Sequence, residues 1–261
     1  MAAEPRMVNA RRPHYAAGMS ATTHEMEFVD VETARTARGV RMAVSAMVPS
    51  PWSEAAKGLF RVAGVRVLAV RSRRADAAVV GAWTGVDNVP VVFHDDEPPR
   101  TNWAAITTLA ARLAGPDQLL PYEPRPRAEA MGLLHEIAGE EGIGWNGRLA
   151  MIDVSIESGG KRGFPLPVAQ YLARRYGYTP EARPGIRARI TTQLAMFHDR
   201  LRVSRDRGHM YLGGARVSAL DIYLATFLTP LSAIPEEACP ALDPTLRRAF
   251  ASAHEEFGEL V

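Results

Sequence analysis

The sequence predicts an α/β unit followed by an all-helical half, with the boundary near Pro121. Two apolar, β-rich segments flank a helical segment early in the chain, and a third β-rich segment begins at Val89. Beyond Pro126 the apolar residues recur with helical spacing only. A change of pattern at a proline-rich stretch is the ordinary sign of a domain boundary. We therefore expect two domains.

The α/β unit begins with a strand, a helix and a second strand. Residues 40–48 (VRMAVSAMV) are apolar and β-rich between Gly39 and Pro49, which predicts a buried strand. Residues 53–63 (SEAAKGLFRVA) carry apolar side chains at helical spacing, and residues 65–70 (VRVLAV) predict the second strand. The short links favour parallel strands joined by a right-handed crossover.

A further strand and helix complete the unit. Residues 89–94 (VPVVFH) predict the strand, and residues 103–114 (WAAITTLAARLA) place apolar side chains on one face of a helix. We assign residues 39–119 to the first domain and residues 120–126 (LPYEPRP) to a linker.

The second domain, residues 127–261, contains only helical patterns. Four glycines interrupt the first of them, and each costs up to about 1 kcal/mol relative to alanine in a helix, which predicts a break near Gly142. The Gly- and Pro-rich residues 156–167 form either a lid over a cleft or a plain connection. The predicted helices span residues 127–156, 166–176, 184–205, 219–228 and 244–255.

One helix start in this domain has a specific signature. Ser218 and Asp221 stand three apart before an apolar run, with Val217 placed to contact Ile222. This is the pattern of a capping box with a hydrophobic staple. We therefore interpret Asp221 as a helix cap and not as a catalytic acid.

Residues 1–38 precede the first predicted strand, and we expect them to be a flexible extension. Their first part is Arg-containing and poor in acids, and it lacks the apolar core of a secretory signal. Met7, Met19 and Met26 leave open that the start codon has been assigned too early.

Composition excludes several classes of function. The 31 basic and 29 acidic residues nearly cancel without a dense basic cluster, so nucleic acid is not an expected partner. Cys239 is the only cysteine, which excludes an internal disulfide and favours a cytoplasmic location. No apolar run is long enough to span a membrane, and the scattered histidines show no metal-ligand spacing. With only two lysines among the 31 basic residues, the composition also indicates a GC-rich bacterial genome.

The order of these elements resembles that of the glutathione transferase superfamily over residues 40–260. Val89-Pro90, the serine-type start Ser50-Pro51-Trp52-Ser53, and residues 211–221 (YLGGARVSALD) match motifs of that family. The resemblance implies a thioredoxin-like first domain packed on a helical domain. It also implies a homodimer, glutathione or another low-molecular-weight thiol as co-substrate with no metal, and a small electrophile as second substrate.

In serine-type members the position of Ser50 carries the catalytic hydroxyl. Such a group donates to the sulfur and favours the thiolate, and the N-terminus of the following helix adds its positive end. Trp52 and Ser53 are expected to contact the thiol ligand. Alternatively, Ser50 and Ser53 serve only as turn and N-cap residues. The arginine usual soon after this start is absent, because Ala-Ala-Lys occupies residues 55–57.

The resemblance assigns the rest of the thiol ligand to two further segments. It implies that the Val89–Pro90 bond is cis and that the backbone of Val89 binds the cysteinyl part, whereas the alternative is a trans proline at an edge strand. Asn102 and Trp103 stand where a γ-glutamyl-binding pair is usual; Asn102 can hydrogen-bond this group, but Trp103 cannot replace a serine hydroxyl. In a shifted alignment Thr101 and Asn102 take these positions.

The second-substrate pocket is expected on the helix that follows the linker. Met131 and His135 lie there, and Trp145 follows. His135 is either a general acid or base near neutral pH, or an ordinary helical histidine. Trp52, Trp103 and Trp145 either line one cleft between the domains or belong to the core.

These features favour an enzyme that activates a thiol at Ser50 for attack on a small electrophile. Addition, displacement and isomerisation share this thiolate, so the reaction type stays open. The alternative is a non-catalytic transferase-fold module for binding or assembly, which Trp103 and the missing arginine favour. A thiol other than glutathione is a third possibility.

Overall fold

The computed structural model describes residues 26–46 and 49–260. Its first domain contains a sheet in the order β1-β3-β2-β4. Strand β3 pairs in parallel with both β1 and β2, and β4 pairs antiparallel with β2. The predicted parallel pair is confirmed. The strands span Met26–Phe28 (β1), Val40–Ser45 (β2), Val67–Ser72 (β3) and Val91–His94 (β4).

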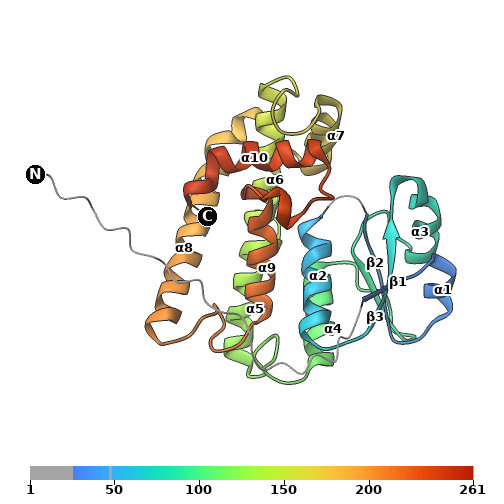
Figure 1. The fold of residues 1–261 in the computed structure, drawn as a ribbon. Coiled ribbons are helices and arrows are strands. Elements are labelled where there is room, and N and C mark those ends of the chain that lie inside the picture. The colour runs from blue at the N-terminus through green and yellow to red at the C-terminus, as the bar shows by residue number, and fades with distance from the viewer. Residues whose placement is uncertain (1–25, 47–48, 261) are drawn as a thin grey trace, which may run out of the picture.

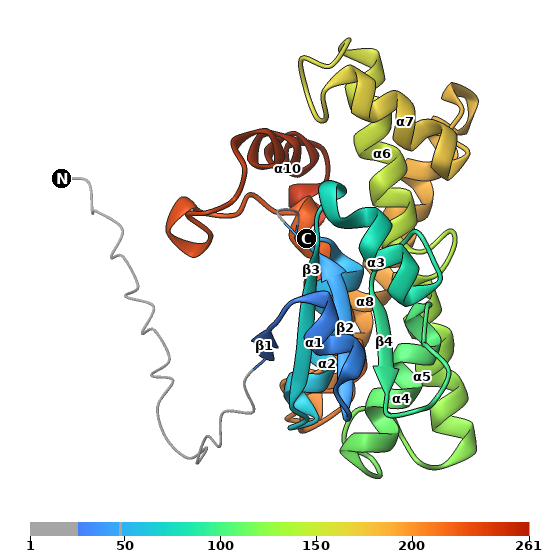
Figure 2. The same cartoon turned by 90° about the vertical axis from the view of Figure 1, so that its right-hand side faces the viewer.

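Helices cover both faces of this sheet (Figures 1 and 2). Met42 and Val44 of β2 belong to the main core beside α2 and α4, whereas Ala43 packs in a small cluster with α1 and α3. This alternation follows from the two-residue period of a strand. The helices are α1 (Val31–Thr36), α2 (Pro51–Val62), α3 (Ala77–Thr84) and α4 (Trp103–Ala114).

The second domain is helical, and its first predicted helix is divided as the glycines indicated. Helix α5 ends at Ala138 and α6 begins at Ile143. A Cβ on Gly142 would lie 2.8 Å from the carbonyl oxygen of His135, so the turn needs glycine there. The helices are α5 (Pro124–Ala138), α6 (Ile143–Glu157), α7 (Leu166–Tyr176), α8 (Arg183–Asp206), α9 (Ala219–Leu228) and α10 (Pro244–Phe257).

A shared core joins the two domains. Helix α2 packs on α9, and Phe60, Tyr223 and Phe227 are almost completely buried between them. Gly58 permits this approach, because a Cβ there would lie 2.8 Å from the Cγ2 methyl of Ile222. Figure 1 shows α2 and α9 side by side between the sheet and the outer helices.

The predicted capping box is present at the start of α9. Asp221 Oδ2 accepts hydrogen bonds from the backbone N–H of Ser218 at 2.9 Å and from its hydroxyl at 2.7 Å. Asp221 Oδ1 accepts from the N–H of Leu212 at 2.7 Å. Both carboxylate oxygens therefore hold backbone in place.

The structure corrects the predicted boundaries at the start of both domains. Residues 26–38 are not a flexible extension, because β1 pairs with β3 and Asp30 caps α1 by accepting from the N–H of Thr33 at 2.8 Å. Residues 1–25, and residues 47–48 of the first predicted strand, lie outside the described residues. Helix α5 begins at Pro124, inside the expected linker, since proline suits the first turn of a helix.

Candidate functional site

A cleft of about 590 Å³ lies between the two domains. Strand ends and helix starts of the first domain form one side, which we call the first wall, and α5, α6, α7 and α9 form the opposite side, the helical wall. The first wall consists of Ser45, Ser50, Trp52, Asn88, Val89, Pro90, Thr101, Asn102, Trp103 and Ile106. The helical wall consists of Ala138, Gly139, Glu140, Trp145, Arg148, Tyr171, Leu172, Arg175, Tyr176 and Tyr223.

Ser50 lies on the first wall as the N-cap residue of α2. Its carbonyl accepts from the N–H of Glu54 at 2.9 Å, but its hydroxyl makes no capping bond to the first turn. Capping is the usual task of a serine at this position. Among the described residues this hydroxyl has no hydrogen-bond partner, and it lies at the positive end of the helix.

Ser53 has a structural role, and the prediction that it contacts the ligand is wrong. Its side chain is fully buried, and its hydroxyl oxygen accepts from the backbone N–H of Ser45 at 3.1 Å. Because α2 begins at Pro51, Ser53 faces β2 and not the cleft.

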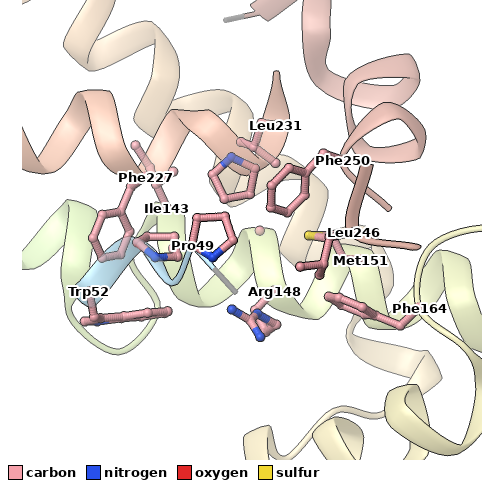
Figure 3. A pocket seen from close by; sticks show the side chains of 14 residues that line it. Pro49, Trp52, Ile143, Arg148, Met151, Phe164, Phe227, Leu231, Leu246 and Phe250 are labelled. Atoms are coloured by element: carbon pink, nitrogen blue, oxygen red, sulfur yellow. The ribbon is translucent and has the colours of Figure 1, made fainter. Parts of the chain in front are cut away.

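Trp52 belongs both to the cleft and to the domain interface. Its indole Nε1–H donates to the carbonyl of Ala138 at 3.2 Å, and its ring meets Phe227 edge-on with centroids 4.8 Å apart. Trp52 also lines a small cavity of about 30 Å³ with mostly apolar walls, shown in Figure 3 together with Phe227 and Ile143. Trp103 and Trp145 also line the cleft, and all three tryptophans pack against the core as well, so the two alternatives left by the sequence both apply.

The Val89–Pro90 bond is cis, as predicted, and both residues line the cleft just before β4. On the same wall Asn102 is the N-cap of α4, where its Oδ1 accepts from the N–H of Ala105 at 2.9 Å. The Trp103 ring meets Tyr223 edge-on at 6.3 Å between centroids. Thr101 lines the cleft too, so all three residues of the two alignments lie at the site.

Met131 and His135, which the resemblance placed in the second-substrate pocket, are not among the residues that line the cleft, although the His135 ring meets Trp103 edge-on with centroids 6.1 Å apart. His135 is exposed, and its ring lies over Gly139 at the end of α5. Only the last turn of α5 and the residues just after it reach the cleft, through Ala138, Gly139 and Glu140. Trp145 does line the cleft and meets Tyr176 edge-on at 4.9 Å between centroids.

The arrangement of both domains matches solved structures of one family. A Tau class glutathione S-transferase from mango, Mangifera indica, superimposes with a TM-score of 0.53 at 20% identity, covering 85% of this chain and 98% of that chain. Beta-etherase LigF from Sphingobium sp. strain SYK-6 gives 0.55 at 17% identity, covering 85% and 99%. The chain has the glutathione transferase fold.

A human theta class glutathione transferase, solved in complex with the glutathione conjugate of 1-menaphthyl sulfate, has the same fold. It gives a TM-score of 0.52 at 15% identity and covers 85% of this chain and 82% of that chain. No family model and no curated protein matches the sequence. The likeness is therefore one of three-dimensional arrangement.

Within this transferase fold, sequence reasoning missed the residues that α6 and α7 supply to the cleft. The sequence predicted the limits of α7 and the break before α6. It did not show which face of either helix meets the first domain, and that face carries Arg148, Tyr171, Arg175 and Tyr176. Tyr171 and Arg175 are four residues apart, which places them on one helix face. This spacing is the only signal that pointed to them.

The phenol of Tyr223 lines the cleft but is already hydrogen-bonded within the protein. Burial raises the pKa of Tyr223, and its hydroxyl donates to the carbonyl of Trp103 at 3.3 Å and accepts from the hydroxyl of Thr107 at 3.1 Å. Among the described residues, no group of three His, Cys, Asp or Glu side chains is placed to hold a metal ion. In residues 26–46 and 49–260, no helix is long and apolar enough to cross a membrane.

Proposed function

We propose that this protein is a glutathione-transferase-like enzyme that binds glutathione, or a similar small thiol, on the first wall and directs it at a small electrophile. The observation that carries the proposal is the hydroxyl of Ser50, which is not used for capping and lines the cleft with cis Val89–Pro90. The transferase fold and the conjugate held by the human theta class neighbour support a thiol in such a cleft.

The proposed chemistry rests on stabilising a thiolate. The Ser50 O–H donates a hydrogen bond to the sulfur as the thiol proton leaves to solvent. The first turn of α2 adds a favourable interaction of about 0.3–1 kcal/mol with the negative charge. Each unit by which the thiol pKa falls corresponds to about 1.4 kcal/mol of preference for the thiolate. The thiolate is then the nucleophile.

The peptide part of the ligand extends along the first wall. The backbone of Val89 pairs with the cysteinyl unit, and the Nδ2 group of Asn102 donates to the γ-glutamyl end. Helix α4 has 12 residues, and its N-terminus favours a carboxylate there. The electrophile then contacts the helical wall.

Glutathione calorimetry with matched variants tests this proposal. The wild type should bind glutathione, and Ser50→Ala should bind it with a raised pKa of the bound thiol, followed by the ultraviolet absorbance of the thiolate. We expect a rise of about one unit, since a hydrogen bond to a charged group contributes about 1.5–3 kcal/mol. Ser72→Ala is the control, because Ser72 ends the neighbouring strand β3 and does not line the cleft.

The outcomes separate the alternatives. An unchanged thiol pKa in Ser50→Ala would remove Ser50 from the mechanism. If Trp103→Ser binds glutathione and the wild type does not, the wild-type cleft binds another thiol or no thiol. This result would rule out glutathione as the co-substrate of the protein. Absence of binding by wild type and Trp103→Ser alike would favour a binding or assembly module.

A further inference from the structure

The two walls of the cleft differ in charge. All ten residues that we assigned to the first wall are uncharged. The helical wall carries two guanidinium groups, Arg148 and Arg175, and one carboxylate, Glu140. A ligand that contacts this wall therefore meets an excess of positive charge.

Arg148 projects from α6 at the edge of the domain interface. Its guanidinium carbon lies 5.7 Å from the ring centroid of Tyr176 and 5.8 Å from that of Phe164. No carboxylate of the described residues lies within 4 Å of it. Figure 3 shows Arg148 at the rim of the apolar side chains, beside Pro49 and Phe164. The charge thus lies near two aromatic rings, and none of the described acids forms an ion pair with it.

Arg175 projects from α7 and is oriented by a phenol. Its Nη1 donates to the hydroxyl of Tyr171 at 3.1 Å. The Asp87 carboxylate of the first domain attracts the Arg175 guanidinium and contributes to its raised pKa. The two groups do not form an ion pair within 4 Å. A guanidinium has five N–H donors in a planar fork, so the bond to Tyr171 leaves donors for a carboxylate.

Aromatic side chains surround these two cations. Trp145 and Tyr176 meet edge-on, with centroids 4.9 Å apart, and Tyr171 and Trp103 also line the cleft. Ring edges and faces of this kind favour a flat aromatic partner. In the proposed binding mode the N-terminus of α4 on the opposite wall receives the γ-glutamyl carboxylate of the thiol ligand, so we assign the two arginines to the second molecule.

From this arrangement we infer that the electrophile is a flat aromatic anion, whose ring contacts Trp145 and Tyr176 and whose carboxylate or sulfonate binds Arg148 and Arg175. The inference rests on the proposed function for the reaction but not for the binding. It names a substrate class, because a neutral aromatic compound would leave both guanidinium groups without a counter-charge.

Calorimetry without any thiol tests the binding. The probes are 4-chloro-3-nitrobenzoate and its neutral counterpart 4-chloro-3-nitrobenzamide. The benzoate should bind at least about tenfold more tightly to the wild type, and Arg148→Met and Arg175→Met should each reduce this advantage about tenfold. Arg174→Met is the matched control, because Arg174 is exposed on α7 and does not line the cleft.

Turnover with glutathione tests the reaction. The thiolate sulfur forms a bond to the ring carbon that bears chlorine, the C–Cl bond breaks, chloride leaves with the electron pair, and the thiol proton goes to solvent. The kcat/KM for the benzoate should exceed that for the benzamide by about tenfold. The Arg148→Met/Arg175→Met double variant should lose this preference while its affinity for glutathione stays unchanged.

Equal affinity of the wild type for the two probes would overturn the inference. So would arginine variants that weaken glutathione binding but not benzoate binding, because the arginines would then serve the thiol ligand. Tight benzoate binding without turnover of either probe would rule out displacement of chloride as the reaction and leave the binding part of the inference standing. Equal turnover of both probes would overturn the inference and leave the proposed function standing.

Discussion

At the scale of single residues, two serines three positions apart have different roles because of where α2 begins. Ser50 precedes the helix, and its hydroxyl is free to meet a ligand in the cleft. Ser53 lies one turn later, where its hydroxyl oxygen accepts from the N–H of Ser45 in the buried interior. One serine therefore supports function and the other supports the fold.

Ser53→Ala should lower the free energy of unfolding by about 1–3 kcal/mol, because the N–H of Ser45 loses its partner in a largely buried place. Ser50→Ala should change it by less than about 0.5 kcal/mol, since among the described residues the Ser50 hydroxyl makes no hydrogen bond that would be lost. Urea unfolding of both variants measures the difference. A larger loss for Ser50→Ala than for Ser53→Ala would contradict these assigned roles.

The sequence was sufficient for the cleft residues that follow a recognisable turn. Ser50, Val89, Pro90 and Asn102 lie next to strand ends or helix starts, and local pattern fixes such positions. It was insufficient for Arg148, because the direction of a mid-helix side chain depends on how α6 crosses the first domain. The same reason explains why His135 lies against Trp103 but outside the residues that line the cleft.

At the scale of elements, three helices of 10 to 12 residues were predicted to the residue, the longer α8 and α10 were predicted to within two residues at each end, and the shortest elements were missed. Helices α4, α7 and α9 have the predicted limits. Strand β1 has three residues and α1 has six, too few for a hydrophobic period to show. Helix α3 is apolar on most of its surface and contains Gly81, so its pattern does not distinguish a helix from a strand.

One charged cluster ties β4 to α4 and makes this junction sensitive to acid. The Glu97 carboxylate lies 2.8 Å from Nδ1 of His94, and it accepts hydrogen bonds from Arg100 and Arg112. The hydrogen bonds with His94 and Arg112 lower the pKa of Glu97 to about 2. His94 ends β4 and Arg112 belongs to α4, so the carboxylate joins two elements.

Glu97→Gln should remove part of the acid sensitivity of the protein. Because the pKa of Glu97 is lowered from 4.5 to about 2 in the folded state, its ionised form stabilises the fold above pH 4.5, and this contribution is lost as the pH falls toward 2. Urea unfolding between pH 6 and pH 3 should show a shallower decline for the variant than for the wild type.

Glu181→Gln is the control for that series, because it removes an exposed carboxylate from the helical domain. Its decline with pH should parallel that of the wild type. If the free energy of unfolding of Glu97→Gln fell with pH as steeply as that of the wild type, the cluster would not contribute to stability between pH 6 and pH 3.

At the scale of the whole molecule, a chain of aromatic rings connects the cleft to the core between the domains. Trp103 meets Tyr223, Tyr223 meets Phe227 at 5.8 Å between centroids, and Phe227 meets Trp52. Trp52 and Trp103 form part of the first wall, whereas Tyr223 and Phe227 belong to α9. The position of α9 therefore determines the shape of the cleft.

Gly144 allows α6 to approach this chain of rings. A Cβ at this position would lie 2.2 Å from Cδ1 and Cε1 of Phe227, so Gly144→Ala forces the buried ring to move. Overpacking of this kind costs about 1–3 kcal/mol. Because Phe227 supports Trp52, we expect this variant to lose stability in urea and to shift its tryptophan fluorescence and its glutathione affinity together.

Gly132→Ala provides the matched comparison, since Gly132 is an exposed helical glycine of α5 with no atom within 4 Å of its Cβ position. It should gain up to about 1 kcal/mol, as alanine is the better helix former. Adding Phe227→Leu to Gly144→Ala should restore part of the stability by making room for the new methyl group. If Gly144→Ala were as stable as Gly132→Ala, close contact between α6 and α9 would not be what holds the two walls of the cleft in register.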